Sequence, residues 1–326
     1  MTHAKHSIDR RTFLAGLAAA ATAGPTSLAF AQGFPTKPIE LIVLFPSGST
    51  ADVTARVLAD GMGKQLGQQV VVVNKPGAGG AIGYKQVQKQ NPDGYTLVFN
   101  SSSISTVYHA GLTPFDYRAF DAIARVTVEN PVVAVRADAP WKDLKSLVAD
   151  ARKRPGMLGM GNSGAGSHTH ITAVAFFHDQ RVEVLHVPFG SAQVVTSLLG
   201  GHIDALVQLP GALTPQVRSG SLRILGALSS KRESAYPSVP TATEQGMAFS
   251  ADMWRGIAAP KGTPAAVIDR LEEALQKVVA SPEFKAQGEK LGFQPSFLPA
   301  REFAPLIAKD DIVLARLMTR VGLKLQ

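Results

Sequence analysis

Near the start of the chain, an apolar, strand-like run is joined by a short polar turn to a helix-like segment, and this order narrows the possible folds. The run Ile39–Phe45 is rich in branched apolar residues, and the turn after it is small, polar and contains a glycine. From Val53 onward, apolar residues recur at helical spacing, so the stretch predicts a strand, a loop and a helix. The N–H groups and the dipole at such a helix start favour an anion. We therefore predict that Phe45–Thr50 forms half of a site for a small carboxylate. The alternative is an ordinary turn with a polar cap.

Strand-like and helix-like segments alternate along the rest of the chain. The apolar runs Val70–Val73 and Tyr95–Phe99 flank a segment with helical spacing, which predicts a doubly wound β-α-β-α-β unit. A second alternating set spans residues 156–229. Residues 123–136, between the two sets, and Trp254–Ala259, after the second, are extended and apolar. These two segments are suited to carry the chain from one lobe to the other and back.

Polar loops follow the predicted strands in both sets. Doubly wound sheets bind ligands beyond the carboxyl ends of their strands. Two facing sets would bring Ser47–Thr50 and Ser101–Ser103 opposite Asn162–Ser167 and the turn at Phe189–Ser191, which predicts a cleft between two lobes. Because these loops are rich in hydroxyl and N–H donors and poor in titratable groups, they favour binding over catalysis.

The composition predicts a globular protein large enough for two domains. The chain has 326 residues, of which 45% are hydrophobic and 18% charged, and it contains no cysteine. That excludes disulfides, thiolate metal sites and cysteine nucleophiles. The formal net charge of +8 is spread along the sequence without a basic run, so we predict no nucleic-acid partner.

The N-terminus has the pattern of an export signal. Arg10 and Arg11 precede the short apolar segment 13–23, and Ala29-Phe30-Ala31 is a cleavage signal. The paired arginines predict a twin-arginine signal peptide over residues 1–31, with cleavage before Gln32 and export to the periplasm. The apolar segment is too short to span a bilayer, and the alternative is a retained N-terminal anchor.

Several motifs resemble catalytic or cofactor sites only formally. Gly159–Gly164 fits the dinucleotide pattern, but its glycines interrupt a predicted strand instead of following it. Ser163 lies in a segment one residue short of a nucleophile elbow, so an exported serine hydrolase is an alternative function. His168 and His170 lack a clear third metal ligand, and Asp52 is placed as a helix-cap residue more than as a base. We predict no metal and no cofactor.

The chain resembles the substrate-binding receptors of tripartite tricarboxylate transporters, the TctC-like or Bug-type proteins, over essentially all of residues 34–326. The resemblance is carried by motifs in a fixed order: Pro38-Ile39 with Phe45–Arg56, Asn74–Gly83, Pro92–Leu97, Gly164–His170, His186–Phe189, Leu198–Asp204, Pro240–Gly246 and Trp254–Pro264. It implies a type II periplasmic-binding-protein-like fold, in which each lobe is a mostly parallel sheet flanked by helices and the lobes close on a small carboxylate.

In this family the carboxylate is held by the loop after the first strand and by facing loops of the other lobe, partly through water. Carried over, the resemblance implies these ligand-binding residues: Phe45, Ser47, Gly48, Ser49, Thr50, Ser101, Ser102, Asn162, Ser163, Ala165, Gly166, Ser167 and Phe189. We predict Gln208 as a further ligand-binding residue.

Three departures from the family pattern concern the ligand. The usual Gly-Gly of the first loop is Gly48-Ser49, and the Glu that often precedes Asn74 is Val73. The usual Pro-Tyr-Lys-Gly turn is Pro188-Phe189-Gly190, without the phenol hydroxyl and the basic residue. If that basic residue holds a second carboxylate in the relatives, this chain prefers a monocarboxylate or a less charged ligand.

The sequence therefore predicts an exported, non-enzymatic, monomeric solute receptor that delivers a small carboxylate to membrane transporter subunits. Lobe 1 is expected to comprise residues 34–132 and 252–326, and lobe 2 residues 133–251. The hinge is expected near Thr127–Val135 and Asp252–Ala258. A ligand sensor for a signalling partner is a further alternative.

Overall fold

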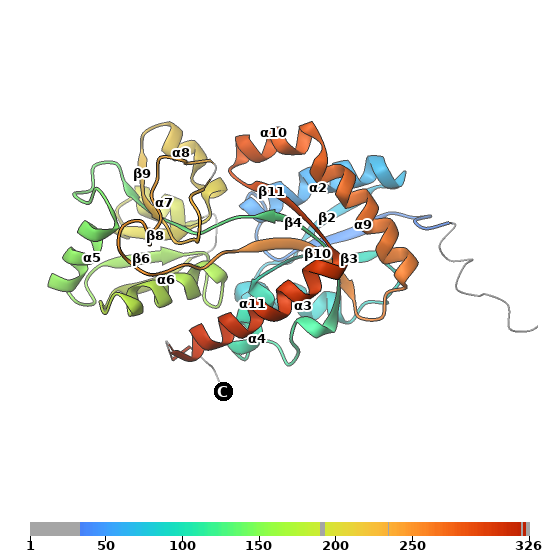
Figure 1. Cartoon of the computed structure of the whole chain (residues 1–326), viewed down its shortest axis with the longest axis horizontal. Coiled ribbons are helices and arrows are strands. Elements are labelled where there is room, and N and C mark those ends of the chain that lie inside the picture. The colour runs from blue at the N-terminus through green and yellow to red at the C-terminus, as the bar shows by residue number, and fades with distance from the viewer. Residues whose placement is uncertain (1–32, 190–192, 234, 321, 324–326) are drawn as a thin grey trace, which may run out of the picture.

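The computed structural model describes residues 33–189, 193–233, 235–320 and 322–323, which form two α/β lobes that lie side by side (Figure 1). The predicted export signal, residues 1–31, lies outside the described residues. Each lobe is built around one open sheet with helices packed against it. No helix in the described part of the chain combines the length and apolar character needed to cross a bilayer.

The sheet of lobe 1 has the strand order β11-β4-β10-β3-β1-β2. β1 pairs in parallel with β2 and with β3, whereas β10, β4 and β11 add to the sheet in antiparallel pairs. The strands are β1 (Ile39–Val43), β2 (Val70–Asn74), β3 (Thr96–Ser101), β4 (Phe120–Val128), β10 (Trp254–Pro260) and β11 (Gln294–Pro299).

The helices of lobe 1 bury their apolar faces against this sheet. In the first of them, α2, Ser49 caps the N-terminus and Gly67, with φ 70°, ends the helix in the left-handed conformation that glycine favours. The helices are α2 (Thr50–Leu66), α3 (Ala81–Gln88), α4 (Ser103–His109), α9 (Ala265–Ala280), α10 (Pro282–Leu291) and α11 (Ala300–Arg320), with the short 3₁₀ helices η1 (Ala78–Gly80) and η2 (Tyr117–Ala119).

The sheet of lobe 2 has the order β7-β6-β8-β5-β9, with β6 parallel to its two neighbours and β5 antiparallel to both of its own. Alternate residues of β5 face opposite sides: Val133 belongs to one buried cluster and Val132 to the other. The strands are β5 (Val132–Arg136), β6 (Gly159–Asn162), β7 (Leu185–Pro188), β8 (Ala205–Gln208) and β9 (Leu222–Ala227). The helices are α5 (Leu144–Lys153), α6 (His168–Asp179), α7 (Gln193–Leu199), η3 (Pro210–Ala212) and α8 (Thr214–Arg218).

Two chain crossings join the lobes. The chain leaves lobe 1 after β4 through residues 129–131 and returns after β9 into β10 (Figure 1). The crossings lie side by side, because the Glu129 N–H donates to the Met253 carbonyl at 2.9 Å. The C-terminal part of α11 also reaches lobe 2, where Met318 packs with Ile171 of α6.

The predicted two-lobed α/β architecture is confirmed, but both sheets are mixed instead of mostly parallel. The parallel pairs come from the predicted βαβ units, and the crossing strands add antiparallel ones. Strand β11 was not predicted, because Pro295 and Pro299 mask its pattern; an antiparallel edge strand tolerates them. Ser101–Ser103 is not a loop: Ser101 ends β3 and Ser103 begins α4, whose apolar side chains are buried. The residue limits of the lobes stay a prediction.

Candidate ligand-binding site

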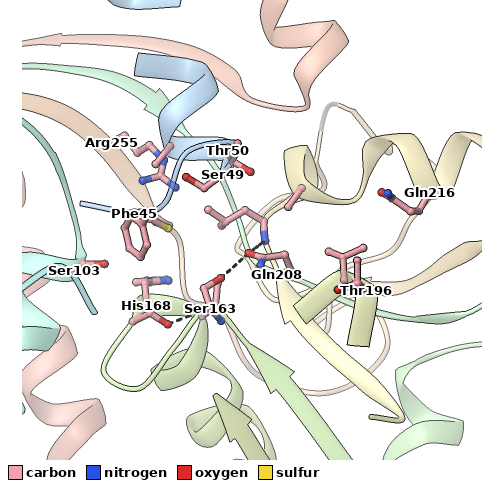
Figure 2. A pocket seen from close by; sticks show the side chains of 18 residues that line it. Phe45, Ser49, Thr50, Ser103, Ser163, His168, Thr196, Gln208, Gln216 and Arg255 are labelled. Carbon is pink, nitrogen blue, oxygen red and sulfur yellow. Dashed lines mark hydrogen bonds between the residues drawn. The ribbon is translucent and has the colours of Figure 1, made fainter. Parts of the chain in front are cut away.

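A cavity of about 200 Å³ lies between the lobes (Figure 2). Both lobes and the returning crossing contribute to its wall, as a cleft receptor requires. Its lining comprises Phe45, Gly48, Ser49, Thr50, Ala51, Ser103, Met253 and Arg255 on one side, and Ser163, Ser167, His168, Thr169, Val195, Thr196, Gln208, Leu209, Ala212 and Gln216 on the other.

The N-terminus of α2 forms one wall of the cavity. The Ser49 N–H donates to the Pro46 carbonyl at 3.1 Å, and the Ser49 hydroxyl accepts from the Asp52 N–H at 3.3 Å. Gly48, at φ 80°, makes the turn that brings this loop against the helix start. The Asp52 N–H is used by this cap, whereas the N–H groups of Thr50 and Ala51 before it have no intrahelical acceptor and remain available to an anion.

Asp52 holds this loop in place. It is 2% exposed, and its carboxylate accepts hydrogen bonds from Gly48 N–H at 2.9 Å and from Asn74 Nδ2 at 3.0 Å. It also pairs with Arg56 at 2.9 Å. Burial raises the pKa of this carboxyl, but these hydrogen bonds outweigh burial and hold the pKa below its ordinary value. Asp52 is thus an ionised structural anchor, in agreement with its predicted role as a cap residue.

The N-terminus of α6 forms the facing wall. The Ser167 hydroxyl accepts from the His170 N–H at 3.2 Å, which caps the helix. The preceding loop is fixed by a hydrogen bond from Ser163 N–H to Thr169 Oγ1 at 3.1 Å, and Gly164 there takes φ 110°. Two helix starts, one from each lobe, therefore point their free N–H groups at the same cavity.

Buried side-chain donors without a partner add to these N–H groups. Among the cavity-lining residues, the donors Ser103 Oγ, Gln208 Nε2 and Arg255 Nη1 are buried without a hydrogen-bond partner in the described protein, as are the ring nitrogen His168 Nε2 and one acceptor, Gln216 Oε1. Gln208 is held by its other atom, because Oε1 accepts from Ser163 Oγ at 2.9 Å (Figure 2). Since buried polar groups are nearly always paired in native proteins, these donors indicate a ligand with acceptor oxygens.

The structure places half of the predicted site residues on the cavity wall. Those that line it are Phe45, Gly48, Ser49, Thr50, Ser163, Ser167 and Gln208. Those outside the lining are Ser47, Ser101, Ser102, Asn162, Ala165, Gly166 and Phe189. Which of the fourteen contact a ligand stays a prediction.

The predicted residues outside the lining mostly serve the framework. Ser47 Oγ donates to Asp52 at 3.3 Å, and Ser102 Oγ accepts from the Trp254 N–H at 3.4 Å. The Gly166 carbonyl accepts from Thr106 Oγ1 of lobe 1 at 2.8 Å, a contact between the lobes. Phe189 packs against an apolar cluster of lobe 2. The predicted turn residues Gly190 and Ser191 lie outside the described residues.

Arg255 is the main lining residue that the sequence analysis missed. It stands in β10, where it is 3% exposed, and pairs with Glu129 at 2.9 Å. The sequence did carry a signal: Arg255 is the one charged residue in the otherwise apolar and small-residue strand Trp254–Pro260.

The geometry gives no support to the catalytic alternatives. Ser163 Oγ donates to the amide oxygen of Gln208, which is not a base, so its hydroxyl is not arranged as the nucleophile of a triad. The described residues contain no cluster of three potential metal ligands of the His, Asp or Glu type. Gly161 is a packing residue inside β6, because a Cβ there would lie 2.4 Å from Ile203.

Comparison with known proteins points to one family. Residues 54–323 match the model described as "Tripartite tricarboxylate transporter family receptor". The chain is 37% identical to protein BugT of Bordetella pertussis over 278 residues, which cover 82% of this chain and 85% of BugT.

Two solved structures are similar over nearly the whole described chain. The periplasmic binding protein BugD matches with a TM-score of 0.82 and 30% identity, covering 90% of this chain and 100% of BugD. R. palustris Rpa4515, solved with adipate, matches with a TM-score of 0.84 and 25% identity, covering 89% of this chain and 98% of that one.

Proposed function

The chain belongs to the tripartite tricarboxylate transporter receptor family, and we propose that it binds a small carboxylate in the cavity between its lobes and delivers it to the membrane subunits of a transporter. As a member of this family it is a solute receptor and not an enzyme. The proposal includes export to the periplasm after cleavage between Ala31 and Gln32, and action as a monomer.

One observation carries the proposal: donors from both lobes converge on one cavity and lack partners in the described protein. The starts of α2 and α6 supply backbone N–H groups, and Ser103, Gln208 and Arg255 supply buried side-chain donors. A carboxylate has two oxygens that accept several hydrogen bonds, so it satisfies such a set. The adipate in the similar R. palustris protein is a ligand of this chemical class.

Binding would close the lobes about the two crossings. The hinge we propose lies near Thr127–Val135 and Asp252–Ala258, between lobe 1 (34–132 and 252–326) and lobe 2 (133–251). The contacts between lobes at Thr106 and Gly166 support a closed arrangement that a ligand in the cavity would stabilise.

Thermal unfolding against a panel of acids tests the proposal. Residues 32–326 would be heated with monocarboxylates, dicarboxylates, citrate, amino acids and aromatic acids. A ligand at 100 times its Kd adds about 2.7 kcal/mol to the folded state, which raises the midpoint by a few degrees. The gain should shrink in Ser163→Ala and Ser49→Ala.

The matched control for Ser49→Ala is Ser281→Ala. Ser281 caps α10 with a similar bond, from the Phe284 N–H at 3.1 Å, but does not line the cavity. The Ser281→Ala variant should have a lower midpoint of thermal unfolding, but the acid should raise that midpoint by as much as in the wild-type protein. A midpoint that no acid raises, in protein stripped of co-purified ligand by denaturation and refolding, would refute the proposed function.

A further inference from the structure

Arg255 presents a buried, partly unsatisfied cation to the cavity. Its Nε donates to Glu129 Oε1 at 2.9 Å, and Glu129 is fully buried. Its Nη1 has no partner in the described protein. The guanidinium carbon lies 6.0 Å from the ring centroid of Phe45 and 5.6 Å from that of Phe99, so aromatic rings flank the charge (Figure 2 shows Arg255 beside Phe45). Glu129 thus occupies one edge of the guanidinium and leaves another for a ligand.

The described lining residues offer the cavity a single positive charge. Arg255 is the only formally charged residue among the described lining residues. His168 also lines the cavity, but burial lowers the pKa of its ring to about 4, which keeps it neutral at pH 7. The acids Glu129 and Asp52 lie just behind the wall, bonded to Arg255 and to Gly48. A second carboxylate on a ligand would meet no cation here and would lie near buried negative charge.

Part of the remaining wall is apolar, and the space is small. Phe45, Ala51, Val195, Leu209, Ala212 and Met253 line the cavity alongside the donors. The volume of about 200 Å³ is somewhat more than the roughly 150 Å³ of an engineered cavity that holds benzene. An aromatic ring or a chain of about six carbons therefore fits in size and polarity.

We propose that Arg255 is the anion anchor of this site and selects a monocarboxylate with an apolar body over dicarboxylates. Glu129 is a positioning residue, which fixes the guanidinium edge without reaching the cavity. This inference rests on the proposed carboxylate-receptor function and adds to it the charge class of the ligand and the side chain that reads it.

Calorimetric titration with matched acids tests the inference. Hexanoate, adipate and hexanamide share a six-carbon chain and carry one, two and no negative charges, and benzoate with benzamide forms an aromatic pair. The wild-type protein should bind at least one monoacid roughly tenfold or more tighter than it binds adipate and the matching amide. The hydrogen bonds of a charged group correspond to about that factor or more.

Variants at the ion pair separate anchoring from folding. Arg255→Gln alone would leave Glu129 buried and unpaired, so the double variant Arg255→Gln/Glu129→Gln, which removes both charges, is the main test. In the double variant, the ratio of the affinity for the acid to that for the amide should fall by roughly 10- to 100-fold. The unliganded double variant should still unfold cooperatively, which would show that it is folded. Glu129→Gln alone leaves the Arg255 cation without its compensating charge and should reduce the difference in affinity between the monoacid and adipate.

The outcomes distinguish this inference from the proposed function. Wild-type protein that binds adipate or citrate as tightly as a monoacid, or a double variant that keeps the wild-type acid-to-amide ratio, would overturn the inference and leave the carboxylate receptor standing. Protein that binds none of the acids would overturn both.

Discussion

Gly211 tests whether binding needs the lobes to approach as closely as they do here. Gly211 lies in η3 of lobe 2 and faces two segments of lobe 1. A Cβ at this position would lie 2.4 Å from the Leu291 carbonyl oxygen and 2.8 Å from Thr50 Cγ2. Carbon atoms in contact sit at about 3.5–4.0 Å, so Gly211→Ala forces the lobes apart by roughly 1 Å.

The cost falls on the closed arrangement alone. Overpacking of this kind costs about 1–3 kcal/mol, and an opening about the crossings would relieve it. Because the proposed mode of binding requires closure, the affinity for the ligand should fall by roughly 5- to 150-fold. The unliganded variant should unfold near the wild-type midpoint, because its lobes can separate.

Calorimetric titration with the acid found in the panel, with thermal unfolding of the unliganded protein, measures both effects. Gly159→Ala is the control, because its Cβ would meet Asp204 at 3.5 Å, an ordinary contact inside lobe 2. Unchanged affinity in Gly211→Ala would refute the closure argument. A decrease in the free energy of unfolding of the unliganded variant as large as its loss of binding free energy would also refute it, because the clash would then be present in the open arrangement as well.

Two further predictions concern buried carboxylates. Asp52→Ala removes the acceptor of Gly48 and Asn74 and should lower the free energy of unfolding in urea by about 1–3 kcal/mol. The control Asp60→Ala removes only an exposed ion pair with Lys64 and should lower it by less than about 1 kcal/mol. Equal losses in the two variants would contradict the anchoring role of Asp52. Glu233 is buried and accepts from Asn130 N–H at 3.0 Å and Gln294 Nε2 at 3.2 Å; burial, with Glu129 nearby, raises the pKa of its carboxyl to about 7 from 4.5. The contribution of Glu233 to the free energy of unfolding is therefore full below pH 4.5 and lost as pH rises through 7, a fall of about 3 kcal/mol. Glu233→Gln should remove this fall when unfolding in urea is measured between pH 4 and 8. Identical pH profiles of the variant and the wild-type protein would contradict this prediction.

The fold and one wall of the site could be predicted because their signals are local. The strand, turn and helix around Ser49 follow from the order of residues in one short segment. The position of Thr50 at the helix start follows from that same segment and needs no information about the rest of the chain. Gln208 was among the predicted ligand-binding residues, and it lines the cavity from the end of β8.

Arg255 and α4 show where local reasoning stops. The direction of the Arg255 side chain depends on the pairing of β10 between β3 and β4, which brings residues far apart in sequence together. A serine run at the end of a strand reads as a loop, but Ile104 and Val107 are buried and draw Ser103 into a helix. Tertiary packing determines both the direction of the Arg255 side chain and the start of α4. For Arg255, the sequence signal was an isolated arginine within an apolar strand.

A crystal structure of the protein with the acid identified by titration would show where the ligand lies. We expect one acid in the cavity between the lobes, with its carboxylate oxygens within hydrogen-bond distance of N–H groups at the starts of α2 and α6 and with Arg255 beside the charge. An acid bound elsewhere, or one whose carboxylate points away from both helix starts, would contradict binding between the lobes by these donors.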